Sequence, residues 1–520
     1  PFNVCSDIDH WIVFLSRNSI KDFTLDNSTN TPYEMHSCIY SCQELTQLKL
    51  VNCILRPPRE LSGFQNVIVL DFNRVTFGNN MLRTLLSRSG LLWRLTIKLC
   101  SGIGHLNIHA PNLLEVLIIN SNSGIDSLSL VGSPKLWFCL IALGKTMASL
   151  TRGKTPSLLG FLVELPRVSD LRLDRYFLEF FADTLRTKAR VRQEFTNAVE
   201  KILLLHSGPI RKFDLRLPEI IRVNFCSDID RWILFLSRNG IKDLTLCSTI
   251  DMPYKMHSCI YSCRELTRLK LVNCILKPPS ELSGFQYVIR LHFQRTTFGD
   301  NTLGPLLSRS GLLERLTIKY CSGIGHLNIN APNLNSLFII DNNGLESLSF
   351  VDTPNLRCFF GSLCDKMGKT PTLMEFLVAL PRVSKLNLDG FFLELLAAGG
   401  SPRNLPATFT LMNSLSLADV EFGDFNFSIN ESTYEEQVVN YLEAPTYMDQ
   451  TLTKLLYVTM HDLVGLKPQL LLIKLLLACS PMLEIMFVGL SEQLDINERF
   501  EISKELSQFP RLSPKAAVIY

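Results

Sequence analysis

A short signature of three apolar residues recurs at a fixed step in this chain. Two residues separate its first apolar position from the second, and one residue separates the second from the third. The signature starts at Leu92, Ile103, Leu114 and Ile125, so the starts are spaced at a constant step of 11 (103 − 92). Its last two apolar residues would share one face of a β-strand, while the residue between them points to the other face. A strand that returns at a constant step predicts stacked coils around one continuous core.

The length of the step predicts how the coils are built. Earlier signatures start at Ile20, Leu45 and Val67, and these steps of 25 (45 − 20) and 22 (67 − 45) have room for a strand and a helix. We call the stretch with the 11-residue step, from Leu92 to Leu136, the ladder. Its step has no room for a helix, so we expect its strands to alternate between the two flanks of a solenoid. The expected fold is therefore an α/β leucine-rich-repeat solenoid with a strand-rich ladder and few helices.

Helices and strands are also predicted outside the ladder. Ser6 and Asp9 fit a capping box, which predicts a helix over residues 6–19. A second helix is expected around residues 82–86, ended by Gly90. After a strand at residues 412–417, the last part of the chain predicts a strand, a helix, a strand, a helix and a final extended segment.

The chain also repeats itself on a larger scale. The string CSDID at Cys5 returns at Cys226, an offset of 221 (226 − 5), and the ladder returns between Leu313 and Leu356. The sequence therefore predicts two tandem repeat blocks. Residues 183–221 lie between the copies and have no counterpart ahead of Pro1, so we expect the first copy to be clipped.

Composition favours a soluble protein that binds neither nucleic acid nor membrane. Lys+Arg 52 against Asp+Glu 49 leaves a net charge of +3, with no concentrated basic face of the kind that nucleic-acid binding needs. The most apolar run, residues 470–479, is too short to span a bilayer. The 15 cysteines are expected to be reduced thiols, which predicts a cytoplasmic and/or nuclear protein.

Two histidine–cysteine patterns and two Gly-Lys-Thr triplets are the candidate chemical motifs. The histidine–cysteine patterns could each offer three zinc ligands, at His36, Cys38 and Cys42 and again at His257, Cys259 and Cys263. They lack a CxxC knuckle and an evident fourth ligand, so packing in the core is the favoured interpretation. The triplets at Gly153 and Gly368 lack the earlier glycine of a phosphate loop. We therefore predict no enzyme activity, no cofactor and no metal.

The residue between the two inward positions of each strand is what a solenoid offers to a partner. In the third unit of the ladder this spacing places Leu117 inside and Ile118 outside, with Ile339 outside in the second copy. Most of the residues at this position are polar or small. We predict that they form a partner-binding face, with Thr24, Lys49, Asp71, Thr96 and Asn107 in the first copy and Thr245, Lys270, His292, Thr317 and Asn328 in the second.

The chain resembles the plant F-box/FBD/leucine-rich-repeat proteins. The resemblance rests on residues 204–210, on the DIDRW string at 228–232 with Leu236-Ser237, on the CSGIGHLNI and APNL strings, and on the C-terminal KELSQFPRLSPKAAVIY. This last string is similar to the end of an FBD module. The resemblance implies the target-recognition part of an F-box subunit of a cullin-type ubiquitin ligase, in which the F-box grips a Skp-type adaptor and the repeats hold a protein target.

No F-box-like segment is identified in the 520 residues, so a Skp-type adaptor is an expected partner only if an F-box precedes residue 1. The alternative is a stand-alone leucine-rich-repeat binding scaffold, or decoy, without a ligase connection. The predicted domains are a first repeat block at 1–182, a connecting helix and strand at 183–221, a second repeat block at 222–423, an acidic polar linker at 424–450 and an FBD-like C-terminal domain at 451–520, which we expect to form a small α+β cap.

Overall fold

The computed structural model describes the chain in separate stretches. These are residues 4–56, 62–120 without 79, 125–143 without 130–132, 134 and 137, 170–173, parts of 193–217, 226–248, 253–362 without 280–281 and 300–302, 382–389, 411–418 and 452–520. They fall into two compact units, Pro1–Glu265 and Leu266–Tyr520. The domain boundaries expected from the sequence stay predictions, and both Gly-Lys-Thr triplets lie outside the described residues.

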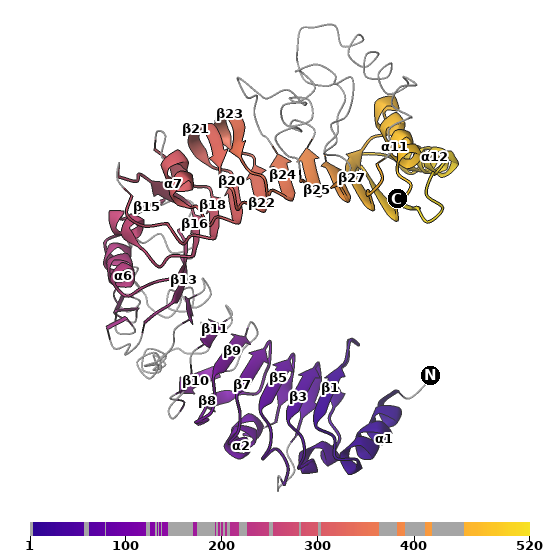
Figure 1. The fold of residues 1–520 in the computed structure, drawn as a ribbon. Coiled ribbons are helices and arrows are strands. Elements are labelled where there is room, and N and C mark those ends of the chain that lie inside the picture. Colours follow the sequence, from indigo (N-terminus) through magenta and orange to yellow (C-terminus); the bar gives the residue numbers. More distant parts are fainter. Residues whose placement is uncertain are drawn as a thin grey trace. The chain divides into compact units, whose positions relative to one another are not determined.

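The first unit is built on a main sheet of parallel strands, with one strand from each coil (Figure 1). The same residue position is paired from each strand to the next, so the coils stack in register. The strands are β1 (Asp22–Asp26), β3 (Gln47–Val51), β5 (Val69–Asn73), β7 (Arg94–Lys98), β9 (Glu115–Asn120), β11 (Phe138–Leu143), β12 (Asp170–Leu173), β13 (Lys212–Arg216) and β14 (Asp243–Cys247).

Helices and short strands form the other flank of the first unit. The helices are α1 (Val4–Arg17), η1 (Ser37–Ser41), α2 (Met81–Arg88), α6 (Cys226–Arg238) and η3 (Ser258–Ser262). The short strands are β2 (Tyr33–Glu34), β4 (Cys53–Leu55) and β6 (Thr76–Phe77) in one parallel sheet, β8 (Gly104–Asn107) and β10 (Ile125–Ser129) in another, and β15 (Tyr254–Lys255). The helix predicted at 82–86 is thus confirmed as α2, and the helix predicted at 6–19 as α1. Helix α1 already includes Val4, so Ser6 lies inside the helix and is not its cap.

The second unit repeats this plan. Its main-sheet strands are β16 (Arg268–Val272), β18 (Arg290–Gln294), β20 (Arg315–Lys319), β22 (Ser336–Ile340), β24 (Cys358–Ser362), β25 (Lys385–Asp389), β26 (Ser414–Ala418), β27 (Tyr457–Leu463), β28 (Ile485–Leu490) and β29 (Ala517–Ile519). Its other flank holds β17 (Cys274–Leu276), β19 (Thr297–Phe298), β21 (Ser322–Asn330), β23 (Asn343–Asp352) and helix α7 (Leu303–Arg309). Helices α11 (Lys467–Cys479) and α12 (Ile496–Gln508) follow near the C-terminus, in the predicted order.

The prediction that the ladder alternates its strands between two flanks is confirmed. Strands β7 and β9 belong to the main sheet of the first unit, whereas β8 and β10 pair with each other in a separate sheet. The second copy does the same with β20 and β22 in the main sheet and β21 and β23 on the other flank. The described residues between Arg94 and Leu143 contain strands and turns and no helix, as the short step requires.

One inward assignment in the ladder is wrong. Val116 and Ile118 are both fully buried, whereas Leu117 is half-buried and lies between them on the opposite face. The prediction that Leu117 faces the core and Ile118 faces outward is therefore reversed, and Ile339 in the second copy is buried as well. Residues 116–119 are all apolar, so alternation alone cannot choose between the two faces. The pairing of Leu117 with Thr96 decides the choice, because it aligns Ile118 with the buried Ile97.

A close backbone contact explains the first glycine of the CSGIG string in both copies. Gly102 and Gly323 adopt φ of +75° and +74°, a region that side chains with a Cβ rarely occupy. A Cβ atom on Gly102 would lie 2.1 Å from the carbonyl oxygen of Phe77, and one on Gly323 would lie 2.2 Å from that of Phe298. The backbone approaches the neighbouring coil too closely for any other residue here.

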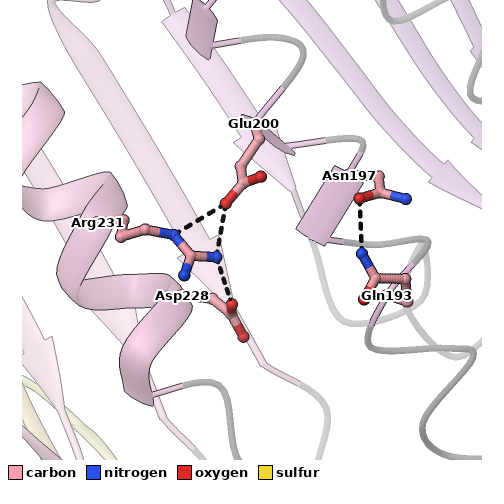
Figure 2. Close-up of polar contacts among 5 residues, drawn as sticks. All are labelled: Gln193, Asn197, Glu200, Asp228 and Arg231. Carbon is pink, nitrogen blue, oxygen red and sulfur yellow. Dashed lines mark hydrogen bonds and ion pairs between the residues drawn. The ribbon is translucent and has the colours of Figure 1, made fainter.

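A small network of ion pairs binds the segment between the copies to helix α6. Residues 193, 196–197, 199–200 and 203–204 are helical, and Glu200 accepts hydrogen bonds of 3.0 and 2.7 Å from the guanidinium of Arg231 (Figure 2). Arg231 also donates to the buried carboxylate of Asp228 at 2.8 Å. Trp232, the next residue of α6, is only 1% exposed, whereas its counterpart Trp11 in α1 is 63% exposed.

The last part of the chain continues the main sheet of the second unit. Strand β27 pairs in parallel with β26, and β28 and β29 follow in the same register. The end of the chain is anchored by side chains: Arg511 donates to the carbonyl oxygen of Ala516 at 2.8 Å, and the buried Ser513 donates to that of Leu483 at 2.7 Å. The C-terminal elements therefore stack on the preceding coils of the second unit.

We expect Ile118→Asp to lower the free energy of unfolding by more than about 3 kcal/mol, because it places an unpaired charge in a packed interior. Leu117→Asp should cost less than half of that, since its side chain lies on the outward face. Chemical denaturation followed by tryptophan fluorescence compares both variants with the natural protein. Equal destabilisation of the two variants would contradict the assigned faces.

The core cysteines should react slowly while the protein is folded. Burial raises the pKa of the Cys53 and Cys321 thiols to about 12 and that of Cys100 to about 11, so little reactive thiolate forms at neutral pH. We expect slow labelling of these three residues by a thiol reagent in the native protein and complete labelling after denaturation without reductant. Mass spectrometry maps the sites, and fast native labelling of Cys53 would contradict the burial.

Candidate protein-binding face

The outward residues of the main sheet form one continuous row in the first unit. Thr24 pairs with Lys49, Lys49 with Asp71, and Asp71 with Thr96. The same register continues through β9, β11, β12 and β13 to Thr245 on β14. The residues on either side of Lys49, Asp71, Thr96 and Thr245 in sequence are buried in the core. Five of the predicted face residues thus share one face, which we call the open face of the first unit.

The open face of the first unit carries both charges. Thr24 and Lys49 are exposed, Asp71 is half-buried, and Thr96 is nearly covered by its neighbours. Two outward residues that sequence reasoning missed form an ion pair: Arg94 donates to Glu115 of the next strand at 2.6 Å. Each of them lies two residues before a residue of the outward row, and alternate residues of a strand share a face. The sequence therefore contained enough information to place them on the open face.

A second ion pair lies further along this face. Asp214 of β13 accepts two hydrogen bonds of 3.0 Å from the guanidinium of Arg216, two positions later on the same side of the strand. Asp214 is buried, so the paired guanidinium offsets the cost of removing its carboxylate from water. Paired charges of opposite sign leave this part of the face nearly neutral.

The open face of the second unit has a different character. Lys270 pairs with His292 and His292 with Thr317, so these three predicted residues are brought together. The row then continues with Phe338 and Phe360, whose rings stack with centroids 6.2 Å apart. Three arginines flank the row at one position of neighbouring strands: Arg268, Arg290 and Arg315. Sequence reasoning missed both the arginines and the aromatic pair.

His292 lies at the centre of this cationic cluster. Its half-buried ring and the nearby charges of Lys270 and Lys319 lower the pKa of the imidazole to about 4, with burial as the larger cause. The side chain of Gln294 acts in the opposite direction through a hydrogen bond. His292 is therefore neutral at physiological pH, and its Nε2 has no hydrogen-bond partner among the described residues.

Two predicted face residues lie elsewhere. Asn107 belongs to β8 and pairs with Ser129 of β10, and Asn328 belongs to β21 and pairs with Ser349 of β23. These strands form the other flank of each unit, not the main sheet. Both asparagines are exposed, but they do not share a face with the other predicted residues. The alternation of the ladder between two flanks is the physical reason.

The histidine–cysteine patterns shape a short helix in each copy. His36 accepts a hydrogen bond from the backbone of Cys38 and so caps η1, and His257 does the same for Cys259 and η3. Cys42 and Cys263 follow the last residues of these helices and are buried. Among the described residues no group of three His, Cys, Asp or Glu side chains is arranged to hold a metal ion, and no helix there is long and apolar enough to cross a membrane.

The leucine-rich repeats of known proteins match parts of both copies. The leucine-rich repeats of the FBD-associated F-box protein At5g56370 match residues 8–178, and the leucine-rich-repeat domain of At1g61320/AtMIF1 matches residues 202–369. The F-box/FBD/LRR-repeat protein At1g13570 of Arabidopsis thaliana is 30% identical over 349 residues, which cover 61% of this chain and 82% of that relative. The chain belongs to the plant F-box/FBD/LRR-repeat family.

Two further relatives from Arabidopsis thaliana match shorter parts of the present chain. The putative F-box/FBD/LRR-repeat protein At5g62970 is 28% identical over 256 residues, 43% of this chain and 56% of the relative. The F-box/FBD/LRR-repeat protein At5g56420 is 24% identical over 210 residues, 38% of this chain and 47% of the relative. The match thus spans about half of each of these two. The repeat matches and the parallel coils identify an α/β leucine-rich-repeat fold and point to protein interaction rather than catalysis.

The lowered pKa of His292 predicts a pH dependence of stability. The unfolded chain binds a proton at this residue below about pH 6.5, whereas the folded protein binds it only near pH 4, so stability should fall as the pH falls through this window. His292→Asn removes this contribution. We expect the midpoint of thermal unfolding of the natural protein, relative to that of the variant, to be lower near pH 4 than at pH 7. A difference that does not change with pH would contradict the shift.

Proposed function

We propose that the chain is the target-recognition part of an F-box subunit of a cullin-type ubiquitin ligase. In this proposal the open faces of the main sheets hold a protein target. The carrying observation is the continuous row of outward side chains on the parallel strands, with Thr24, Lys49 and Asp71 in the first unit and Lys270 and His292 in the second. Helices and second sheets lie on the other flank, so they leave this row available to a partner.

The proposal includes two tandem repeat blocks and an FBD-like C-terminal domain. Equivalent residues support the blocks: Tyr33 donates a hydrogen bond to Asp9, and Tyr254 donates one to Asp230 at 2.6 Å, with both residues offset by 221. The strands and helices of residues 452–520 support a terminal unit, which a solenoid needs to shield the apolar residues of its last coil. We also propose a cytoplasmic or nuclear location, where the adaptor and cullin would act.

The alternative is a stand-alone binding scaffold or decoy without a ligase connection. The two proposals differ in adaptor binding, because a Skp-type adaptor contacts the F-box and not the repeats. If the chain is a ligase subunit, the adaptor binds only when an F-box precedes residue 1. A target held by a chain without an F-box would be shielded from ubiquitination.

We expect that residues 1–520 alone do not capture a purified Skp-type adaptor, while a fusion with a family F-box ahead of Pro1 does. A pull-down of the adaptor with both proteins tests this expectation. Stoichiometric capture by the unfused chain would show that the repeats or the C-terminal domain contain an adaptor surface of their own. Failure of the fusion to bind would remove the support for a ligase subunit and favour the scaffold.

Target recognition by the open face is tested with charge swaps that keep the net charge. Lys49→Glu with Asp71→Lys exchanges two neighbours in the row of the first unit. Glu501→Lys with Lys504→Glu is the matched control, because these residues form an exposed ion pair on helix α12. Proximity labelling in plant cells should lose target proteins with the face swap and keep them with the control. The same set of labelled proteins in both variants would contradict recognition by this face.

A further inference from the structure

The two copies differ in charge on equivalent strands of their open faces. On β3, β5, β7 and β9 the outward positions carry three cationic and two anionic side chains, Lys49, Arg94 and Lys98 against Asp71 and Glu115. On β16, β18, β20 and β22 they carry five cationic side chains and no anionic one, with Arg268, Lys270, Arg290, Arg315 and Lys319. The second copy has His292 where the first has Asp71, and Ser336 where the first has Glu115.

Arg290 and Arg315 lie close together on neighbouring strands, and Arg315 lacks the acidic partner that its counterpart Arg94 has in the first copy. Arg290 is in register with Arg268 on one side and with Arg315 on the other, and neighbouring strands are about 4.8 Å apart. Like charges at such positions destabilise a sheet. In the first copy Arg94 binds Glu115, but Arg315 faces Ser336 at the equivalent place. Arg290 and Arg315 have no ion-pair partner among the described residues.

A pair of phenylalanines lies on the open face next to the cationic strands. Phe338 and Phe360 are outward residues of β22 and β24, are half-buried, and stack at an angle of 25° between their rings. The first copy has Leu117 in place of Phe338. From β16 to β24 the face spans four strand spacings, or about 19 Å, which an extended segment of about six residues covers. A ligand of this size would meet charge first and an apolar surface next.

We propose that the open face of β16, β18, β20, β22 and β24 binds an acidic peptide segment of a partner protein. Its carboxylates would lie against Arg290, Arg315 and Lys270, and its apolar residues would pack on Phe338 and Phe360. This inference rests on the proposed target-recognition function and names the chemistry of the target. Nucleic acid fits less well, because the cationic positions are confined to three strands of a chain whose net charge is only +3.

The first copy supplies the variants that test this proposal without a foreign sequence. Arg290→Val with His292→Asp places on β18 the residues that β5 carries at the same positions, Val69 and Asp71. The core residues of the two strands are identical, so this exchange should fold. Lys277→Gln with Arg309→Gln is the matched control, because it changes the net charge by the same amount at exposed positions away from the open face.

The probe is a fluorescein-labelled peptide with glutamates in one half and leucine and phenylalanine in the other. We expect fluorescence anisotropy to show saturable binding to the full chain that weakens as salt is added. The exchange on β18 should weaken binding by about tenfold or more, and the control pair should leave it unchanged. The reciprocal exchange, Val69→Arg with Asp71→His, should strengthen binding to the first copy.

Several outcomes would overturn the inference. Equal loss of binding in the β18 exchange and in the control pair would mean that only net charge attracts the peptide. Absence of binding by the natural chain, or a β18 exchange without effect, would remove the site. Tighter binding of single-stranded polyuridylate at the same residues would make the face a nucleic-acid site instead. The charge swap of Lys49 and Asp71 tests the proposed function separately. If that swap loses cellular targets while the peptide assay gives any of these results, the proposed function stands and only this inference is contradicted.

Discussion

The parallel pairing of one strand per coil is the constraint on which the rest of this structure depends. Each main-sheet strand pairs residue for residue with the next, so that Leu48, Leu70 and Leu95 form one line and Leu50, Phe72 and Ile97 form another. All six of these side chains are fully buried. Because successive side chains of a strand point to opposite faces, a line of core residues forces the residues between them into a line on the open face. Packing therefore aligns the candidate binding residues.

The two copies differ in the residues of the open face and agree in the residues of the core. The core pairs of β3, β5 and β7 recur without substitution in β16, β18 and β20, where Leu291, Phe293 and Leu316 occupy the same lines. A change of even one methylene group in such an interior has a cost, which restricts these positions. The open face is free of that restriction. Arg290 and His292 stand where the first copy has Val69 and Asp71, on an otherwise similar strand. One scaffold thus presents a nearly neutral face in one unit and a cationic face in the other.

Much of the local structure could be predicted from the sequence, because it depends on short-range patterns. The apolar spacing of Leu82, Leu85 and Leu86 predicts helix α2, and the short step of the ladder predicts strands on alternating flanks. The inward side of residues 116–119 could not be predicted, because every one of them is apolar. Asn107 and Asn328 were placed on the wrong flank because the step that predicts alternation also moves every second strand away from the main sheet. The binding roles of the remaining face residues stay predictions.

The sequence by itself determined the repeat, its two kinds of step, the duplication with its offset of 221, and the family to which the chain belongs. These are properties of spacing and identity along the chain. Only the tertiary structure decided that Ile118 faces the core, that Arg94 is paired with Glu115, and that Arg290 lies between Arg268 and Arg315. The reason is physical: parallel register brings together residues that belong to different coils and lie far apart in the sequence. The character of a face depends on that register and not on any one strand.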